Sequence, residues 1–438
     1  MTSRPRLTWT NWARTETAHP ASVVSPASTE EVAAVVRAAT AGDLRIKPVG
    51  SGHSFTGIAV TDGVQLRMDR MRRLLALDAT SGLVTVQAGI DLHDLDVALA
   101  GCGLALENLG DIDSQTVSGA ISTGTHGTGA RLGGLATQVR ALQMVLADGS
   151  VVTASAQEHP ELFAAARVGL GALGVITEVT LACVPAFLLR AVERPEPLDA
   201  VLGSLDASAQ AHDHFELYWF PHTARVQTKR NDRVAPGTRP QPVPPWRRRL
   251  DDELLANTVF EGLNRLATRR PALVPAINAV AARALTAREY VAPSHDVFTS
   301  PRRVVFRECE YAVPRESVGH VITELRAWVD THDERIPFPV EVRFAAADDI
   351  WLSTAHERDS AYVAVHQYHR LAHERWFSAF ETIAADVGGR PHWGKMHSRT
   401  GTELRDLYPR FDDFTALRNR LDPGRVFANP YLERVLGR

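Results

Sequence analysis

The chain has 438 residues, of which 45% are hydrophobic, so it is too long for one core and has enough apolar residues to build two domains. Its formal net charge of −3, with lysine and arginine scattered along the chain, argues against binding to DNA or RNA. The three widely spaced cysteines indicate neither disulfides nor a zinc site, and no 18-residue apolar run or signal-peptide core occurs, so we expect a cytoplasmic protein without a membrane span.

Short strands alternate with helices from about residue 22 to residue 185, which favours an α+β fold. Ser28 and Glu31 form a capping-box pattern at the start of an apolar helical repeat. The sequence Ala-Asp-Gly-Ser at 147–150 is typical of a hairpin turn. The predicted elements are a helix at 29–41, a strand at 83–86 and a hairpin of strands 142–146 and 151–153.

A glycine-rich segment at 48–57, Pro-Val-Gly-Ser-Gly-His-Ser-Phe-Thr-Gly, follows the strand-like residues 44–47. Gly50 and Gly52 lack the Cβ atoms that keep a backbone away from a pyrophosphate, and consecutive N–H groups in such a turn can bind an anion. The spacing differs from the nicotinamide-dinucleotide fingerprint, and residues 56–60 do not start a helix. This segment alone is compatible with either a tight loop or a phosphate-binding site.

Two further glycine-rich runs follow. Residues 116–129 alternate glycines with small hydroxyl residues, which suits close backbone approach to a polar ligand. Residues 169–179 lead from glycines into a β-branched strand.

After residue 185 the strands become longer. We expect helices at 252–268, 316–331 and 371–386, a proline-rich surface loop at 234–245, and a buried or lid helix at 271–285. Residues 338–344 alternate with period two, which places Glu341 and Arg343 on one strand face. Periodicity alone favours a solvated strand face on which these two side chains form a salt bridge. His366, on a strand at 364–368, could be a core histidine or a ligand-binding group.

These motifs, in this order, resemble the PCMH-type FAD-binding domain of the vanillyl-alcohol oxidase superfamily. The sequence Gly-Arg-Pro-His-Trp-Gly-Lys at 389–395 resembles the signature of its sugar-lactone and polyol oxidases. The resemblance extends from about Asn11 to Leu436. It implies an FAD-binding domain of two α+β subdomains at 11–187, a mixed-sheet substrate domain at 188–390, and a C-terminal segment at 391–438 that returns to the FAD domain.

The resemblance also implies a cofactor, FAD, bonded covalently through the imidazole of His53 to the 8α-methyl group of the flavin. Without the resemblance, a histidine in a glycine turn is an ordinary hydrogen-bonding group. The residues implied to bind FAD are Gly50, Ser51, Gly52, His53, Ser54, Asp111, Thr116, Val117, Ser118, Gly119, Ser122, Gly124, Thr125, His126, Gly127, Gly174, Val175, Ile176 and Lys395.

The implied chemistry is removal of a hydroxyl proton while the carbon-bound hydrogen leaves as hydride to flavin N5. Negative charge develops on the substrate oxygen and then on the flavin, so fixed cations are the main source of stabilisation. Arg343 and Lys395 are the implied cations, and Glu341 orients substrate hydroxyls and holds Arg343. A desolvated Lys395 could also share in proton removal. Asp111, Glu341, Arg343, His366 and Lys395 are the implied substrate-binding residues.

Asp111 and His366 stand where related polyol oxidases tend to carry small hydroxyl residues, which favours a lactone substrate. We therefore expect an aldono-1,4-lactone oxidase or dehydrogenase, resembling the L-gulono- and D-arabinono-lactone enzymes. The resemblance also implies that Gly110, at a position where alanine is associated with dehydrogenases, leaves a path for O2 to the flavin, so we expect O2 or another acceptor to take the electrons. The alternatives are an alditol oxidase producing H2O2, the flavin subunit of a sugar epimerisation system, and a flavin-free binding protein, which the intact glycine segments disfavour.

Overall fold

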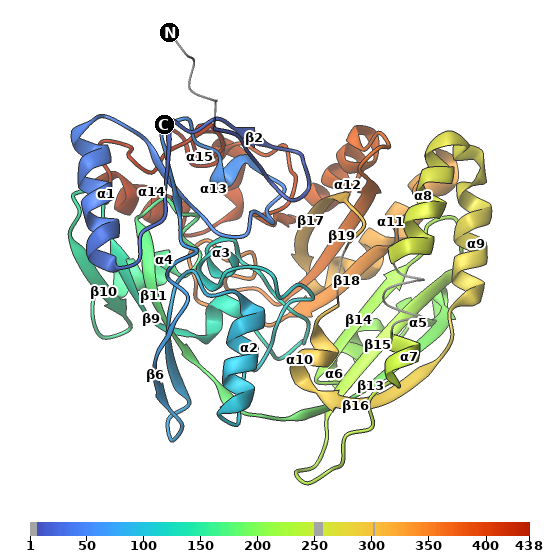
Figure 1. Ribbon diagram of the computed structural model, residues 1–438. Coiled ribbons are helices and arrows are strands. Elements are labelled where there is room, and N and C mark those ends of the chain that lie inside the picture. Colours follow the sequence, from blue (N-terminus) through green and yellow to red (C-terminus); the bar gives the residue numbers. More distant parts are fainter. Residues whose placement is uncertain (1–6, 249–256, 301–302) are drawn as a thin grey trace.

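The computed structural model describes residues 7–248, 257–300 and 303–438. Figure 1 shows two lobes: the N-terminal half lies together with the C-terminal helices, and a large sheet with its own helices lies beside them. The expected α+β fold is confirmed by this mixture of helices with sheets that are mainly antiparallel.

A small parallel sheet and one helix begin the first lobe. The sheet has the order β3 (Ser22–Val24), β5 (Val64–Arg67), β4 (Ile46–Val49). The helix α1 (Thr29–Ala41) matches the prediction, and the Ser28 side chain accepts from the Glu31 N–H at 3.3 Å. The Glu31 carboxylate accepts instead from the Ala27 N–H, so the capping box is shifted by one residue at its second contact.

The second sheet of this lobe is antiparallel. Its order is β10 (Val151–Ser155), β9 (Val139–Val145), β11 (Val175–Ala182), β7 (Leu83–Gln87), β6 (Leu74–Asp78). The predicted hairpin is present, with Val151 opposite Val145. The strand predicted after the third glycine run is β11. After the first glycine run a single 3-10 turn, η1 (Gly57–Ala59), forms where no helix was expected.

The second lobe is built on one large sheet. Within the described residues its strand order is β16 (Arg288–Pro293), β13 (Leu188–Pro197), β15 (Arg225–Arg233), β14 (His214–Trp219), β18 (Val340–Ala345), β19 (Ser360–Tyr368), β17 (Phe306–Pro314), β20 (Arg390–Pro391). Strand β18, which carries Glu341 and Arg343, therefore lies between β14 and β19.

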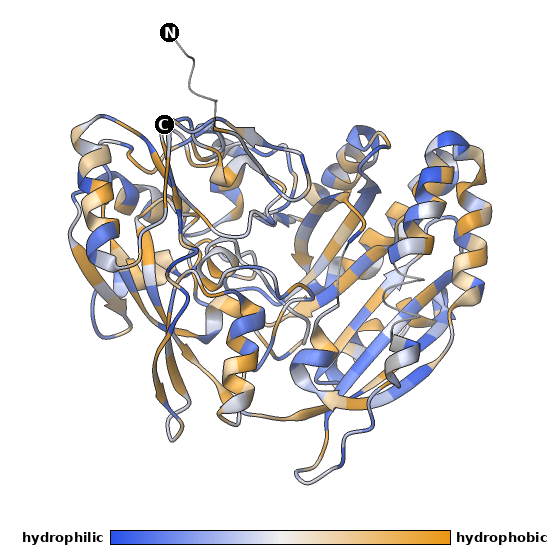
Figure 2. Ribbon diagram, viewed as in Figure 1, coloured by the Kyte–Doolittle hydropathy of each residue, from blue (hydrophilic) through white to orange (hydrophobic). Residues whose placement is uncertain are grey.

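One face of this sheet is apolar and carries helices. Residues Val340, Val342 and Phe344 of β18 belong to a buried cluster with side chains from α5 (Leu198–Leu202), α6 (Leu205–Ala211), α11 (Val318–Thr331) and α12 (Glu374–Asp386). Alternate residues on these strands are hydrophilic, as the blue and orange bands in Figure 2 show. The opposite face of the sheet carries the polar side chains of the site described below.

The predicted helices of this lobe are found with two qualifications. Helix α8 (Phe260–Arg269) is the described part of the expected 252–268 helix, whose first residues, 252–256, lie outside the described ranges. The 271–285 segment forms η4 (Pro271–Leu273) and α9 (Val274–Ala284). Helix α9 buries Asn278 but leaves Val280 65% exposed, so it packs on one side only. The proline-rich stretch is a loop up to α7 (Pro245–Arg248).

The C-terminal helices pack into the first lobe. Leu404 of α13 (Gly401–Leu407), Phe414 of α14 (Phe411–Leu421) and Val435 of α15 (Pro430–Leu436) share a buried cluster with Val32 of α1. None of the helices in the described ranges is both long and apolar enough to cross a membrane.

Candidate active site

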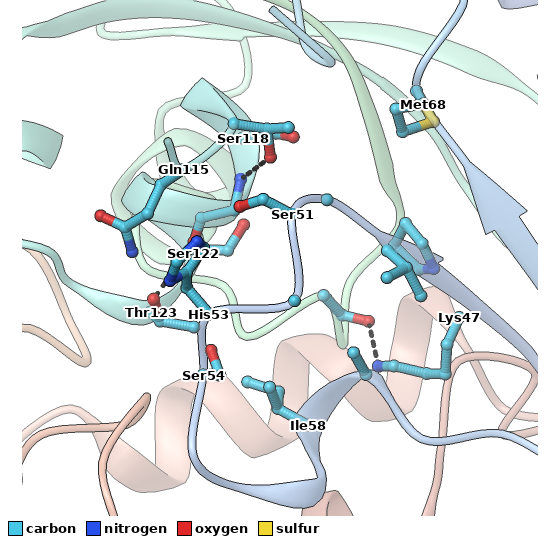
Figure 3. A pocket seen from close by; sticks show the side chains of 18 of the residues that line it. Lys47, Ser51, His53, Ser54, Ile58, Met68, Gln115, Ser118, Ser122 and Thr123 are labelled. Carbon is cyan, nitrogen blue, oxygen red and sulfur yellow. Dashed lines mark hydrogen bonds between the residues drawn. The ribbon is translucent and has the colours of Figure 1, made fainter. Parts of the chain in front are cut away.

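A cleft with about 860 Å³ of empty space, part of it open to solvent, lies where the three glycine-rich segments meet. Figure 3 shows Ser51, His53 and Ser54 of the first segment facing Ser118, Ser122 and Thr123 of the second. Of the residues expected to bind the cofactor, the cleft is lined by Gly50, Ser51, Gly52, His53, Ser54, Thr116, Ser118, Gly119, Ser122, Gly174 and Ile176.

Two glycines in the cleft lining, Gly50 and Gly52, have no room for a larger side chain. A Cβ at Gly50 would overlap the Thr116 hydroxyl, which accepts from the Gly119 N–H at the start of α3 (Val117–Thr123). Gly52 has φ of +74°, a conformation that strongly favours glycine, and a Cβ there would lie 3.2 Å from the Trp9 ring. Backbone atoms and small hydroxyls therefore form this part of the wall, which allows the close approach that a pyrophosphate group requires.

Lys47 lies under the first glycine segment and lines the same cleft. Lys47 is 1% exposed, and its ammonium group donates to the carbonyls of Gly171 and Phe427, each at 3.1 Å. Burial lowers the pKa of Lys47 to about 7, against the opposing effect of Asp422. A negatively charged phosphate close to this buried amine would favour its charged form.

His53 lies in the middle of the first glycine segment and lines the cleft. Its Nε2 lies 2.9 Å from the Ser114 hydroxyl, and its ring stacks on Trp12 with centroids 5.5 Å apart. Burial, helped by the positive charge of Lys395, lowers the pKa of His53 to about 4. At neutral pH the ring is therefore uncharged, and a ring nitrogen keeps the lone pair needed to bond to carbon.

Glu341 and Arg343 share one face of β18, as the periodicity predicts. That face is buried rather than solvated: their side chains are 8% and 9% exposed. Arg343 pairs with Glu341, donates from Nε to Glu216 at 3.1 Å, and approaches Asp111 at 3.4 Å. Burial opposes its charge, but the three carboxylates outweigh it and raise the pKa of Arg343 well above its ordinary value. Arg343 is thus a fixed cation.

Lys395 approaches the same region from the loop after β20. Its ammonium group contacts Glu308 of β17 at 2.5 Å and lies 5.2 Å from the centre of the Phe55 ring. Burial alone would lower the pKa of Lys395, but Glu308 and Glu310 more than compensate and raise it. The loop is also fixed to the glycine segment, since the Phe55 N–H donates to the Gly394 carbonyl at 2.7 Å.

His366 packs its ring against Phe306 of a buried aromatic cluster, with centroids 5.2 Å apart, and its polar atoms face Glu308 and the backbone. Its Nδ1 lies 2.9 Å from the Pro339 carbonyl and its Nε2 lies 3.5 Å from Glu308. Burial disfavours a charge on this ring, but Glu308 outweighs burial and raises the pKa of His366. His366 and Lys395 therefore share one carboxylate.

Some expected cofactor residues lie outside the cleft lining, namely Asp111, Val117, Gly124, Thr125, His126, Gly127, Val175 and Lys395. Asp111 and Lys395 belong to the charged network at the sheet. His126 stacks on Tyr362 with centroids 3.5 Å apart and contacts Glu310 at 3.1 Å. A Cβ at Gly127 would overlap Asn108, so this glycine serves local packing.

The sequence reasoning did not find Glu216, Glu308 and Glu310. All three are buried on the polar face of the large sheet. A signal was present at Phe306–Val313, where Glu308 and Glu310 alternate with apolar residues at period two. Glu310, His126 and His392 lie close enough together to hold a metal ion. The ring nitrogens of the two histidines are already hydrogen-bonded: those of His126 to Gly127 and Glu310, and those of His392 to Gly124 and Gly394.

Two family models match the chain. The D-arabinono-1,4-lactone oxidase model matches residues 179–435, and an FAD-binding-domain model matches residues 20–155. The second match indicates that the cofactor is FAD.

Relatives are similar along their whole length. An L-gulono-1,4-lactone dehydrogenase from Mycobacterium tuberculosis is 41% identical, over 98% of this chain and 99% of its own. An L-gulonolactone oxidase from Bos taurus is 39% identical, over 97% of each chain. An alditol oxidase from a Streptomyces species is 31% identical, over 98% of each chain. A solvent-stable cholesterol oxidase has the same fold, with a TM-score of 0.84 at 20% identity over 99% of this chain and 98% of the other.

Proposed function

Because this chain belongs to the D-arabinono-1,4-lactone oxidase family of FAD-dependent oxidoreductases, we propose that it oxidises an aldono-1,4-lactone of the L-gulono, L-galactono or D-arabinono type. The observation that carries the proposal is a pair of fixed cations: Arg343, on the polar face of the large sheet, and Lys395, whose loop lies against the His53 segment and contacts that face through Glu308. Electrons pass to O2 or to another acceptor.

The residues of the cleft fit FAD. Gly50, Gly52 and Gly119 give the close backbone approach that a pyrophosphate needs, and the amine of Lys47 lines the same cleft, where a nearby phosphate would favour its charged form. Bound FAD would supply the two-electron oxidation by accepting a hydride from the substrate carbon. We further propose that His53 holds the flavin covalently, supported by its uncharged ring at the edge of the cleft.

The chain's own side chains would bind and orient the lactone. Arg343 can donate to two substrate oxygens from its planar group, while Glu341 accepts from a hydroxyl. Lys395 stabilises the negative charge that appears on the reacting oxygen. Asp111 and His366 replace the small hydroxyl residues expected of a polyol site, and this supports a lactone rather than an open-chain alditol.

The test is reduction of the enzyme's flavin under nitrogen by a panel of lactones and polyols, followed by loss of its visible absorbance. This measurement needs no assumption about the electron acceptor. A γ-lactone should reduce the flavin fastest. If xylitol or sorbitol is faster, the protein is an alditol oxidase instead, and no reduction by any member would remove both assignments.

A further inference from the structure

Glu308 is a buried carboxylate that lies against two basic side chains of the site, Lys395 and His366. It lies on β17 directly opposite His366 of β19 and is 5% exposed. One oxygen, Oε2, contacts the Lys395 ammonium at 2.5 Å, and the other, Oε1, lies 3.5 Å from His366 Nε2. Each oxygen therefore serves a different partner.

The backbone around Glu308 holds the same loop. The Met396 N–H donates to the Glu308 carbonyl, and the His392 N–H donates to the Glu310 carbonyl, each at 2.9 Å. Lys395 thus emerges from a loop fixed on both sides of it to β17. Its side chain has little choice of position, because Phe55 covers one side and Glu308 accepts from its end.

The other charges around Lys395 cannot replace Glu308. Glu310, on the same strand, makes its direct contact with His126. Asp111 acts on Lys395 at longer range and pairs with Arg343. The rings of His53 and His392, with pKa values lowered to about 4, are neutral at neutral pH and cannot balance the ammonium charge. The direct partner of the ammonium is Glu308.

We propose that Glu308 is a positioning residue, which fixes the Lys395 ammonium and the His366 ring and keeps Lys395 positively charged in the active site. The inference rests on the proposed function, which gives Lys395 its role. An ammonium group has no lone pair, so the arrangement assigns Lys395 to charge stabilisation and not to removal of the hydroxyl proton.

The first test measures Lys395 directly in the FAD-loaded protein without substrate. Acetylation of Lys395 by acetic anhydride is followed by peptide mass spectrometry from pH 6 to pH 11. Without its carboxylate partner the buried amine should deprotonate ~1 to 3 pH units lower, so Glu308→Gln should shift the labelling curve by that amount. Glu308→Asp keeps the charge at a longer distance and should shift it less. Glu193→Gln, which removes a buried partner of Arg288 on the same sheet, is the control.

The second test is the pH dependence of flavin reduction by a saturating lactone. In Glu308→Gln the rate of flavin reduction should fall about tenfold at neutral pH. The alkaline limb of the pH–rate profile should also move to lower pH than in the unmodified enzyme. Glu308→Asp should restore part of the rate and part of the profile. A labelling curve for Glu308→Gln that coincides with that of the unmodified protein overturns the inference. If the glutamine variant does not fold, an unshifted curve for Glu308→Asp overturns it equally.

The failure of the proposed function would look different. Lys395→Met with normal flavin reduction would remove Lys395 from the reaction whatever the labelling shows. Slow reduction in Lys395→Met with an unshifted curve in Glu308→Gln would keep the function and reject only the role of Glu308.

Discussion

Asp111 and Arg343 form an ion pair at 3.4 Å between Oδ2 and Nη2, and this contact joins the first lobe to the central strand of the large sheet. The loop around Asp111 is held from the second lobe as well, because the Ser300 N–H donates to the Asp111 carbonyl at 3.0 Å. The proposed substrate site is therefore made from both lobes. Its charge balance depends on how they pack together.

The first prediction concerns Arg343. Arg343→Lys keeps a positive charge but loses the planar group that contacts Glu216 and Glu341 together. We expect flavin reduction by a lactone to slow by ~10²-fold or more, the usual effect of removing one preorganised electrostatic group. Stopped-flow absorbance under nitrogen measures the rate. Arg288→Lys, in the ion pair with Glu193, is the matched control and should reduce normally. A normal rate in Arg343→Lys would place the active site elsewhere.

The second prediction is covalent attachment at His53. After acid denaturation and gel electrophoresis, the unmodified protein should keep its flavin fluorescence, because an imidazole–carbon bond survives these conditions. His53→Ala should lose the fluorescent band but still bind FAD before denaturation, since the glycine-lined walls remain. Complete release of flavin from the unmodified protein by acid would disprove the attachment.

How far the sequence predicts this site depends on the kind of information needed. Alternation at 338–344 correctly placed Glu341 and Arg343 on one strand face, because strand geometry is local. It did not predict that the face is buried, because burial comes from a lobe that is distant in sequence. The same limit explains why Glu216 was missed: strand β14 becomes a neighbour of β18 only through the sheet order.

Local propensity also failed at 117–123. These residues are rich in serine, threonine and glycine, which are poor helix formers, yet they form α3. The Thr116 side chain caps the helix at its first turn. The helix also buries three apolar side chains in the hydrophobic core of the first lobe, those of Val117, Ala120 and Ile121. Tertiary packing outweighed propensity here, so the glycine run was recognised as a ligand segment but not as a helix.

The third prediction concerns substrate class. L-gulono- or L-galactono-1,4-lactone should exceed xylitol and sorbitol in kcat/KM by at least about tenfold, since each polar contact left unpaired costs ~1 to 3 kcal/mol. The double variant Asp111→Ser, His366→Thr should narrow the ratio. Steady-state rates with an artificial acceptor measure it. A ratio unchanged by both substitutions would exclude these two residues as the source of the preference.

The fourth prediction is a pH dependence of stability from Lys47. Its pKa is about 7 in the folded protein against an ordinary value of 10.5, so between these pH values the unfolded chain binds one more proton. The free energy of unfolding should therefore rise with pH across this window, by about 1.4 kcal/mol per pH unit from this group. Below pH 7 the cost of burying the charged amine is fully present.

Lys47→Met isolates this effect. Urea unfolding should be measured at pH 7 and pH 9 in a His53→Ala background freed of flavin, so that FAD phosphates add no charge. The lysine form should gain stability relative to the methionine form as the pH rises. Parallel pH dependence of the two proteins would show that Lys47 keeps its proton in the folded protein, and its pKa would then not be lowered.

The last prediction concerns reaction with O2 and Gly110. We expect glycine here to leave a path toward the proposed flavin site, and a carboxylate such as Asp111 at about 4 Å from superoxide would oppose its negative charge by roughly 1 to 4 kcal/mol, depending on the dielectric. We expect measurable peroxide production, with artificial acceptors faster. A Cβ at Gly110 would lie 3.2 Å from Thr125 Cγ2 and 3.3 Å from the His126 carbonyl, so Gly110→Ala also presses on this loop. FAD content is therefore measured alongside. With FAD content unchanged, Gly110→Ala should slow reoxidation by O2 in stopped flow while leaving anaerobic reduction nearly unchanged. Equal reoxidation of both proteins would show that residue 110 does not control access, and equal loss of both half-reactions would show that the methyl group disturbs the site itself.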